Sequence, residues 1–367
     1  MKNKKMTKTS KAVSDDEKQY MKSYRFKDGE LEIALITRSR AKTVHKFMEH
    51  CIDSISEINA SFSIYDSSSD DSTENIVREY VNCGYIINYI RLPYEYPLGE
   101  KYLDSILNSN ANYIWPIGDS TAIDFREFAN KAYKYIENGA DLIVNYGNIV
   151  KQFEGIDFKE PKELYRNCLW FMTWLGSEIY HKELYRGILT EKTKKDIIFK
   201  MNNGYGSWYP QLGILLEALE QKKTIHTYVI GLNTEGLTTL EKNQAWVKDS
   251  LRTWCRDLCL LVDTCGANYK DELDHAIRST WEILKLDGDY WLCRSRMENG
   301  INTVLYEEYD RLGYIDRVSN NKNRIKQWAY MDQDEAIRRF KVIKLRRRVE
   351  GKIKRTVRKV YSIFKLE

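Results

Sequence analysis

Between residues 31 and 146, short apolar segments alternate with amphipathic segments that are long enough to form helices. The segments between the apolar runs hold 9 to 16 residues with a helical spacing of apolar side chains. Strands separated by helices of this length are typical of βαβ units, so the sequence predicts an α/β fold with a mainly parallel sheet flanked by helices. The expected strands are 31–37, 60–66, 85–92, 113–117 and 141–146, and the expected helices are 43–58, 74–82, 99–109 and 125–139.

After residue 150 the alternation becomes irregular, and helices are expected from residue 244 to about residue 286. Within 245–263, tryptophan and leucine side chains recur at helical intervals, which indicates a helical subdomain beyond the α/β domain. The expected divisions are a flexible basic arm at 1–29, the α/β domain at 30–235, the helical subdomain at 236–335 and a basic amphipathic tail at 336–367.

The composition is that of a globular protein, because 43% of the 367 residues are apolar and can bury a large core. Apolar runs such as 33–36 and 258–262 are far shorter than the roughly 18 residues that span a bilayer. The start of the chain is polar and lacks the apolar core of a signal peptide, so we expect a cytoplasmic protein. The seven cysteines include no CxxC pair, which favours reduced thiols and no zinc site.

The net positive charge of the chain comes from its last 31 residues, where 13 Lys and Arg stand against two Glu. Removing that local charge of +11 from the net +5 leaves −6 for residues 1–336, which argues against a nucleic-acid-binding protein. Three partners remain open for the tail: an anionic membrane surface, which we rank first, nucleic acid, and an apolar surface of this or another protein. Apolar side chains recur on one helical face at Val342, Leu345, Val349, Ile353, Val357, Val360 and Phe364.

Polar side chains follow the expected strands at the points where the strands end. In an open parallel sheet, ligands bind at the carboxyl ends of the strands, so these are the residues to inspect first. They are the segments 37–40, 66–69, 93–101 and 118–121.

The order of these strand ends resembles the nucleotide-sugar-binding half of family 2 glycosyltransferases, which have the Rossmann-like GT-A fold. Those enzymes begin with a strand ending in Pro-Thr-aromatic-Asn-Arg, and ITRSR at 36–40 matches it at Thr37 and Arg40. Their second strand ends in Asp-Asp-Gly-Ser-Thr-Asp-Gly-Thr, and DSSSDDST at 66–73 matches it in part. The resemblance implies that Asp66 accepts a hydrogen bond from the nucleobase or ribose, while Asp71 and Thr73 shape the loop and cap the next helix.

The fourth strand of that family ends in a DxD motif, whose carboxylates hold a divalent cation on the donor diphosphate. Here Asp119 stands in that place, followed by Ser120 and Thr121, so the motif is incomplete. The resemblance implies Mn²⁺ or Mg²⁺ as cofactor, with Asp119 as its ligand, and Lys101 or Arg40 could add positive charge for the diphosphate. The expected nucleotide-sugar-binding residues are Thr37, Arg40, Asp66, Lys101 and Asp119.

The resemblance also implies a general base that deprotonates the acceptor hydroxyl. Many relatives carry a Glu-Asp pair before the helix that here begins near Gln211, but SWYPQ at 207–211 holds no carboxylate. Glu178 and Asp196 are the alternative catalytic candidates, and for each a solvated or capping carboxylate is an equally good reading. Trp208 is the aromatic residue we expect to contact a glycan acceptor.

Together these features predict a glycosyltransferase of the hexosyltransferase type (EC 2.4), inverting, that uses a nucleotide-diphosphate sugar. Its acceptor is expected to be a glycan or lipid-linked molecule in surface polysaccharide or glycoconjugate synthesis, handled at the inner face of the cell membrane. A homo-oligomer is also possible. The alternative is a non-catalytic nucleotide- or glycan-binding module with the same fold. A nucleotidyltransferase is disfavoured because no Gly-rich phosphate loop follows the first strand.

Overall fold

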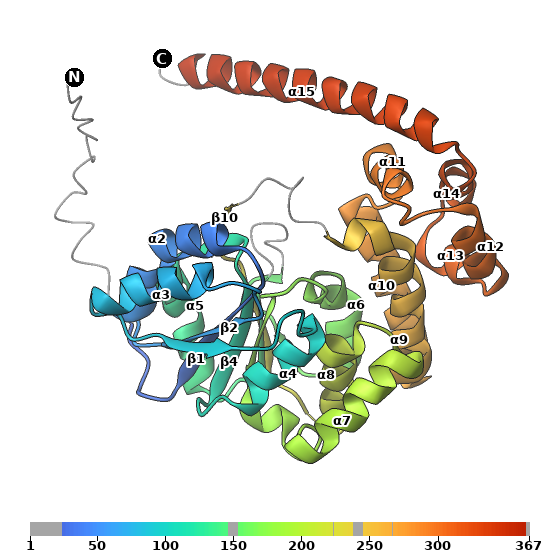
Figure 1. The fold of residues 1–367 in the computed structure, drawn as a ribbon. Helices are drawn as coiled ribbons and strands as arrows, with labels where there is room; N and C mark the ends of the chain where they lie inside the picture. The colour runs from blue at the N-terminus through green and yellow to red at the C-terminus, as the bar shows by residue number, and fades with distance from the viewer. Residues whose placement is uncertain (1–23, 146–152, 223, 238–244, 266, 365–367) are drawn as a thin grey trace, which may run out of the picture.

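The computed structural model describes residues 24–145, 153–222, 224–237, 245–265 and 267–364, shown as a ribbon in Figure 1. The strands are β1 (Leu31–Thr37), β2 (Ser61–Asp66), β3 (Asn88–Arg91), β4 (Tyr113–Gly118), β5 (Thr121–Ile123), β6 (Leu142–Asn145), β7 (Asp157–Phe158), β8 (Glu178–His181), β9 (Thr227–Ile230) and β10 (Thr234–Gly236). The helices of the first part are α2 (Ala41–Glu57), α3 (Ser72–Asn82), α4 (Leu98–Leu107), α5 (Phe125–Glu137), α6 (Pro161–Met172), α7 (Glu191–Lys200) and α8 (Ile214–Glu220). Those of the C-terminal part are α9 (Asp257–Cys265), α10 (Lys270–Leu284), α11 (Asp289–Met297), α12 (Thr303–Arg311), α13 (Tyr314–Val318), α14 (Lys322–Ala329) and α15 (Gln333–Phe364).

Within the described residues, one large sheet has the strand order β3-β2-β1-β4-β8-β6-β9-β7. The pairs β1–β2, β1–β4, β2–β3 and β6–β9 are parallel, whereas β8 runs antiparallel to both β4 and β6. β5 and β10 form a separate antiparallel pair. The predicted α/β class, with a mainly parallel sheet flanked by helices and a helical C-terminal part, is confirmed.

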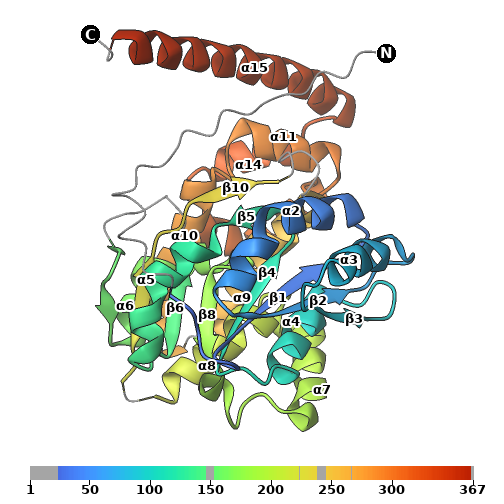
Figure 2. The same cartoon turned by 90° about the vertical axis from the view of Figure 1, so that its left-hand side faces the viewer.

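The sheet separates two hydrophobic cores, since alternate residues of a strand point to opposite faces. In β1, Ile33 and Leu35 join the core that α2, α3 and α5 cover, while Ala34 and Ile36 join the core beneath α4, α6 and α8. A strand that is buried on both faces needs consecutive apolar residues, which explains the run IALI at 33–36 in β1. Figures 1 and 2 show these helices on the two sides of the sheet.

The core beneath α4, α6 and α8 continues into the C-terminal helices, because buried residues of α9, α10, α11 and α14 belong to the same cluster. The expected boundary at residues 235 and 236 remains a prediction. β7, β8 and β9, which the irregular pattern after residue 150 did not reveal, complete the sheet.

Helix α15 is a single long helix that extends across the top of the view in Figure 1. Its first turns pack on α11, and the Arg347 guanidinium lies 4.1 Å from the centre of the Tyr290 ring. Val342, Leu345, Val349 and Ile353 are all exposed. Among the described residues, no helix is long and apolar enough to cross a membrane. The backbone of Val357, Val360 and Phe364, also expected on this apolar face, is part of α15, but their side chains lie outside what the structure describes.

Candidate active site

The carboxyl ends of β1, β2 and β4 lie side by side, because the three strands are parallel neighbours. Thr37 is in register with Asp66, and Ile36 is in register with Gly118. The polar segments that follow these strands are therefore brought together at one edge of the sheet. This confirms the juxtaposition on which the sequence-based site was built.

Asp119 is held between two of the other predicted residues. Its Oδ2 atom accepts a hydrogen bond of 2.6 Å from the Thr37 hydroxyl, and its Oδ1 atom lies 2.6 Å from a guanidinium nitrogen of Arg40. Burial raises the pKa of Asp119, and the charge of Arg40 and the bond from Thr37 oppose that shift. Both carboxylate oxygens are thus engaged within the protein.

The turn between β1 and α2 places Arg40 opposite Asp119. Ser39 adopts a left-handed backbone conformation with φ of 53°, which costs energy in a residue with a side chain. Its backbone N–H donates a 2.7 Å hydrogen bond to the Ser68 hydroxyl, so the loop after β2 holds the loop after β1. We expect this fixed turn to keep Arg40 in place at the first residues of α2.

Lys101 reaches the same edge from the first turns of α4 and is 3% exposed. Its ammonium group donates to the Thr37 carbonyl at 2.9 Å and to the Ser67 hydroxyl at 2.8 Å. Burial, together with the like charge of Arg38, lowers the pKa of Lys101 to about 8, although Asp66 and Asp119 act in the opposite direction. A buried ammonium group on neutral acceptors is well suited to receive an anion.

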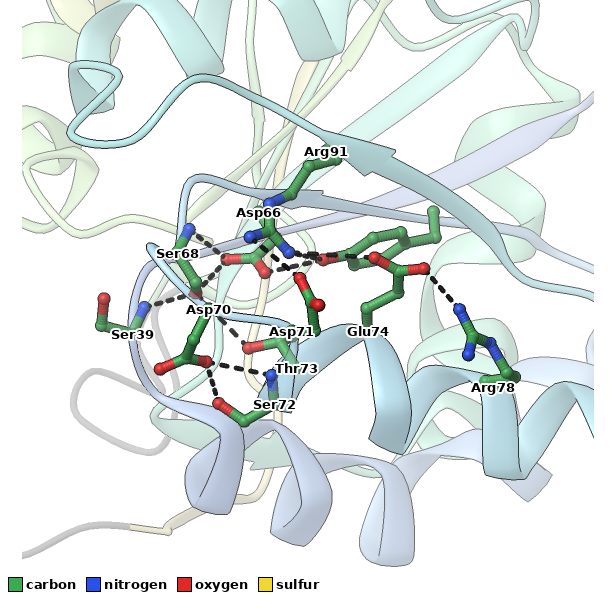
Figure 3. A network of polar contacts seen from close by, with 11 residues as sticks. Ser39, Asp66, Ser68, Asp70, Asp71, Ser72, Thr73, Glu74, Arg78 and Arg91 are labelled. Atoms are coloured by element: carbon green, nitrogen blue, oxygen red, sulfur yellow. Dashed lines mark hydrogen bonds and ion pairs between the residues drawn. The ribbon is translucent and has the colours of Figure 1, made fainter.

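Asp66 is fully buried and organises the loop after β2, as Figure 3 shows. Its Oδ1 atom accepts bonds from the backbone N–H of Ser68 at 2.9 Å and from the Ser68 hydroxyl at 2.5 Å. Its Oδ2 atom accepts a 2.8 Å bond from the Tyr89 hydroxyl on β3. These contacts give Asp66 a structural role in the loop, and contact with a nucleobase stays a prediction.

The rest of the Asp/Ser-rich stretch differs in part from expectation. Asp71 is the first residue before α3, but its side chain makes no capping bond and lies 3.5 Å from Arg91. Asp70 instead accepts bonds from the backbone and hydroxyl groups of Ser72 at the start of α3. Thr73 is buried with its hydroxyl 3.4 Å from that of Ser68, which fits the expected role in shaping the loop.

Glu178, the first residue of β8, also lies toward this edge. Since β8 runs antiparallel to β4 with Ile114 opposite Tyr180, Glu178 lies near the carboxyl end of β4. Its side chain is buried, and both carboxylate oxygens lie 3.4 Å from the amide nitrogen of Gln211. Burial raises the pKa of Glu178 to about 8, which makes the protonated form the major one at neutral pH.

A pocket of about 130 Å³ adjoins these groups. Gly118 and Ser177, the neighbours in sequence of Asp119 and Glu178, both line it. Ile117, Asn145 at the end of β6, residues of the β5–β10 pair and the segment 174–176 form the rest of its wall. The pocket is therefore a space at the carboxyl edge that a part of a ligand could enter.

For Asp196 and Trp208, contact with a ligand remains a prediction. Asp196 is an exposed residue of α7, and among the described residues no contact joins it to Asp119, Asp66 or Lys101. Trp208 packs edge to face on Trp254 and donates a 2.6 Å hydrogen bond to the Thr253 carbonyl. Trp208 is thus tied to the helical part, and a role in acceptor binding is not needed to explain it.

The residues present do not fit a divalent-cation site of the DxD kind. Among the residues that the structure describes, no group of three or more His, Cys, Asp or Glu side chains could hold a metal ion. The carboxylate of Asp119 is engaged by Arg40 and Thr37, and Asp124 accepts bonds from backbone N–H groups at the start of α5. Mn²⁺ or Mg²⁺ as a cofactor therefore finds no support in this arrangement.

Sequence reasoning missed several residues of the site. Ser67 and Ser68 fall in the segment 66–69 that the sequence marks for inspection, but it gives them no individual role, and Tyr89 falls within the expected strand 85–92. All three bond directly to Lys101 or Asp66. Gln211 belongs to the segment 207–211, where the resemblance implies a carboxylate that this sequence lacks. Its amide nitrogen lies 3.4 Å from Glu178. The polar residues at strand ends were the available signal for Ser67 and Ser68.

No family model matches the chain, and no curated protein matches it. Among solved structures, the chain is similar to residues 1–349 of TarS from S. aureus, with 10% identity, a TM-score of 0.47 and coverage of 83% of this chain and 93% of that one. It is also similar to the mannosyltransferase PcManGT from Pyrobaculum calidifontis in complex with GDP-Man and Mn²⁺, with 9% identity, a TM-score of 0.48 and coverage of 87% and 88%. A third likeness is to glucosyl-3-phosphoglycerate synthase from Mycobacterium tuberculosis, with 12% identity, a TM-score of 0.42 and coverage of 65% and 80%. At these values the likeness concerns the broad arrangement of elements and assigns no activity or ligand to this chain.

Proposed function

We propose that the protein is a glycosyltransferase that binds a nucleotide-diphosphate sugar at the carboxyl edge of β1, β2 and β4. One observation carries the proposal. The predicted residues Thr37, Arg40, Lys101 and Asp119 form one connected cluster at that edge, with Asp66 in the adjoining loop. Because ligands of open α/β sheets bind at this edge, the cluster is where a donor would bind.

The charges of the cluster suit a diphosphate. Arg38, Arg40 and Lys101 bring three positive charges to this edge, against the two carboxylates of Asp66 and Asp119. Both carboxylates are buried, whereas Arg38 is exposed and Arg40 is half-buried. Lys101 is buried as well, so a ligand that approaches this edge from solvent meets Arg38 and Arg40 first, which favours an anionic group.

In the proposed inverting reaction, the acceptor hydroxyl attacks C1 of the donor sugar and loses its proton to a base. Glu178 is our candidate base: with a pKa of about 8 only a minority of the carboxyl is ionised at neutral pH, but that ionised form is a stronger base than an ordinary carboxylate. Access to its buried carboxyl would have to come from the adjoining pocket beside Ser177. Asp196 is the weaker candidate, since it is exposed on α7.

The side chain of Glu178 is only 1% exposed, and this favours the second candidate function, a non-catalytic module that binds a nucleotide or glycan. The two functions differ in turnover. A transferase releases nucleoside diphosphate from its donor when an acceptor is present, whereas a binding module returns the donor unchanged.

We propose further that α15 attaches the protein to an anionic membrane surface, next to a glycan or lipid-linked acceptor. The exposed Val342, Leu345, Val349 and Ile353 are accompanied by basic residues along the same helix. Such a helix lies in the interface with its apolar face in the lipid and its cations near the headgroups. The surface-polysaccharide pathway, the hexosyl class and the inner face of the membrane are parts of this proposal.

A binding screen tests the donor site. The purified protein and Lys101→Met are mixed with UDP-, dTDP-, GDP- and CMP-sugars, and the unfolding temperature is followed. Stabilisation by UDP-, dTDP- or GDP-sugars that Lys101→Met loses supports the proposal, whereas stabilisation by CMP-sugars alone, which carry a single phosphate, would contradict a diphosphate donor. Lys46→Met, an exposed lysine of α2, is the control that should keep it. If no sugar nucleotide stabilises the wild-type protein, the proposed function is wrong.

A further inference from the structure

Asp119 differs from a metal-binding carboxylate in what surrounds it. Its side chain is 2% exposed, and its two oxygens are taken up by the Thr37 hydroxyl and the Arg40 guanidinium, each at 2.6 Å. The Arg40 side chain is 31% exposed. At this point of the edge the carboxylate is therefore covered, and a cation stands between it and solvent.

The residues near Asp119 do not supply a second carboxylate that could bind a divalent cation together with it. Asp119 is followed by Ser120 and Thr121, which are neutral, and by Asp124, whose carboxylate accepts from the backbone N–H of Arg126 at 3.0 Å. The carboxylate of Asp66 is engaged by Ser68 and Tyr89. A divalent cation that bound a remaining lone pair of Asp119 would lie beside the Arg40 guanidinium, whose positive charge repels it.

Positive charge is already present beside Asp119. Lys101 bonds to a backbone carbonyl and a serine hydroxyl, and neither of these contacts is with a carboxylate. Burial is costly for an ammonium ion, and the charges of Asp66 and Asp119 offset that cost for Lys101 only in part, so a further anion would be favourable. Arg40 is a planar donor that can hold two oxygens of a phosphate at once.

We propose that Arg40, oriented by Asp119, neutralises the donor diphosphate together with Lys101 and takes the place of a divalent cation. This inference rests on the proposed function and deepens it. Arg40 and Lys101 are then catalytic residues that touch the diphosphate, and Asp119 and Thr37 are positioning residues.

The chemistry balances without a metal ion. The bond from sugar C1 to the phosphate oxygen breaks, and its electron pair stays on that oxygen, which gains negative charge. The acceptor oxygen forms the new bond to C1, and its proton passes to the base. The N–H groups of Arg40 and Lys101 stabilise the charge that develops on the leaving diphosphate.

The test measures the dissociation constants of UDP, dTDP, GDP and CDP by calorimetry, first in EDTA and then in Mn²⁺. For the nucleotide that binds, we expect values in EDTA and Mn²⁺ that agree within about twofold. Arg40→Ala should weaken binding about tenfold or more, because it removes charged hydrogen bonds. Arg40→Lys should recover part of that loss, since it keeps the charge. Arg126→Ala, which removes an exposed arginine paired with Glu57, should bind like the wild type.

Asp119→Asn separates the two mechanisms most clearly. In the arginine mechanism, the variant removes a negative charge next to the diphosphate, so nucleotide binding should stay within about threefold while turnover falls because Arg40 is less well oriented. In a metal mechanism, the variant would lose its ligand and its nucleotide. Circular dichroism verifies that each variant is folded.

The outcomes distinguish this inference from the proposed function. Binding that requires Mn²⁺ and disappears in Asp119→Asn would overturn the role of Arg40 and leave a nucleotide-binding transferase in place. Binding in EDTA that Arg40→Ala does not weaken would also overturn it. If none of the four nucleotides binds in either condition, the proposed function itself fails.

Discussion

Glu178 offers a quantitative test of how the edge of the sheet is built. Its carboxyl is buried, and the Ser177 side chain and the Gln211 amide, the latter at 3.4 Å, are its side-chain donors. Burial raises its pKa from 4.5 to about 8. The folded state therefore binds the proton more tightly than the unfolded state, and stability falls as the pH rises from about 4.5 to about 8.

The magnitude follows from the shift. A shift from 4.5 to about 8 is worth about 5 kcal/mol of unfolding free energy once the group is ionised in both states. Between about pH 5 and pH 7, this linkage predicts a loss of about 2 to 3 kcal/mol in the wild type. Glu178→Gln has no proton to lose. The stability of the variant relative to the wild type should therefore rise by that amount over the same range.

Urea unfolding at the two pH values measures the effect, because the difference between variant and wild type cancels other titrating groups. Glu79→Gln, at an exposed position on α3, is the matched control and should show no such change. If the Glu178→Gln difference is the same at both pH values, Glu178 is ionised in the folded protein and the burial argument is refuted.

Three further predictions concern the cluster, its loop and the last helix. Since the pKa of Lys101 is about 8, affinity for a nucleoside diphosphate should fall as the pH rises through about 8, and a calorimetric pH series on Lys101→Met should lack that step. Ser68→Ala leaves the buried Asp66 short of a donor and should lower the free energy of unfolding in urea by about 1 to 3 kcal/mol. The control Ser72→Ala, beside the exposed Asp70, should lower it less. Equal losses of stability in the two variants would count against a buried loop. The double variant Leu345→Asp, Val349→Asp should reduce sedimentation with vesicles that contain an anionic phospholipid by about tenfold or more, while Val304→Asp on α12 should not. If the wild-type protein binds purely zwitterionic vesicles equally strongly, the role of charge is contradicted.

The first half of the fold could be predicted from local sequence because its strands are buried on both faces and its helices are amphipathic. Each expected element between residues 31 and 146 is present, with ends within three residues of those predicted. β8 could not be predicted in the same way. The strand has only four residues, Glu178–His181, and its place between β4 and β6 depends on pairing with residues far away in sequence. β5 and β10 are shorter still and pair across more than a hundred residues.

In the site, too, some residues could be predicted from local sequence and others could not. Thr37, Asp66 and Asp119 follow strands and could be identified by position alone. The pairing of Arg40 with Asp119 depends on the left-handed turn at Ser39, and nothing in the sequence of a serine between two arginines indicates that turn. The sequence likewise does not show that Asp70, and not Asp71, accepts the bond from Ser72 at the start of α3, because this depends on how the loop orients the two carboxylates.

The position of a bound diphosphate tests the central claim most directly. A crystal structure of the protein with the nucleoside diphosphate that binds best, grown in EDTA, would locate the two phosphorus atoms. The account predicts them at the carboxyl edge of β1, β2 and β4, within hydrogen-bonding reach of Arg40 and Lys101, with Asp119 still bound to Arg40. A nucleotide bound elsewhere, or one held at this edge without contact to either cation, would contradict it.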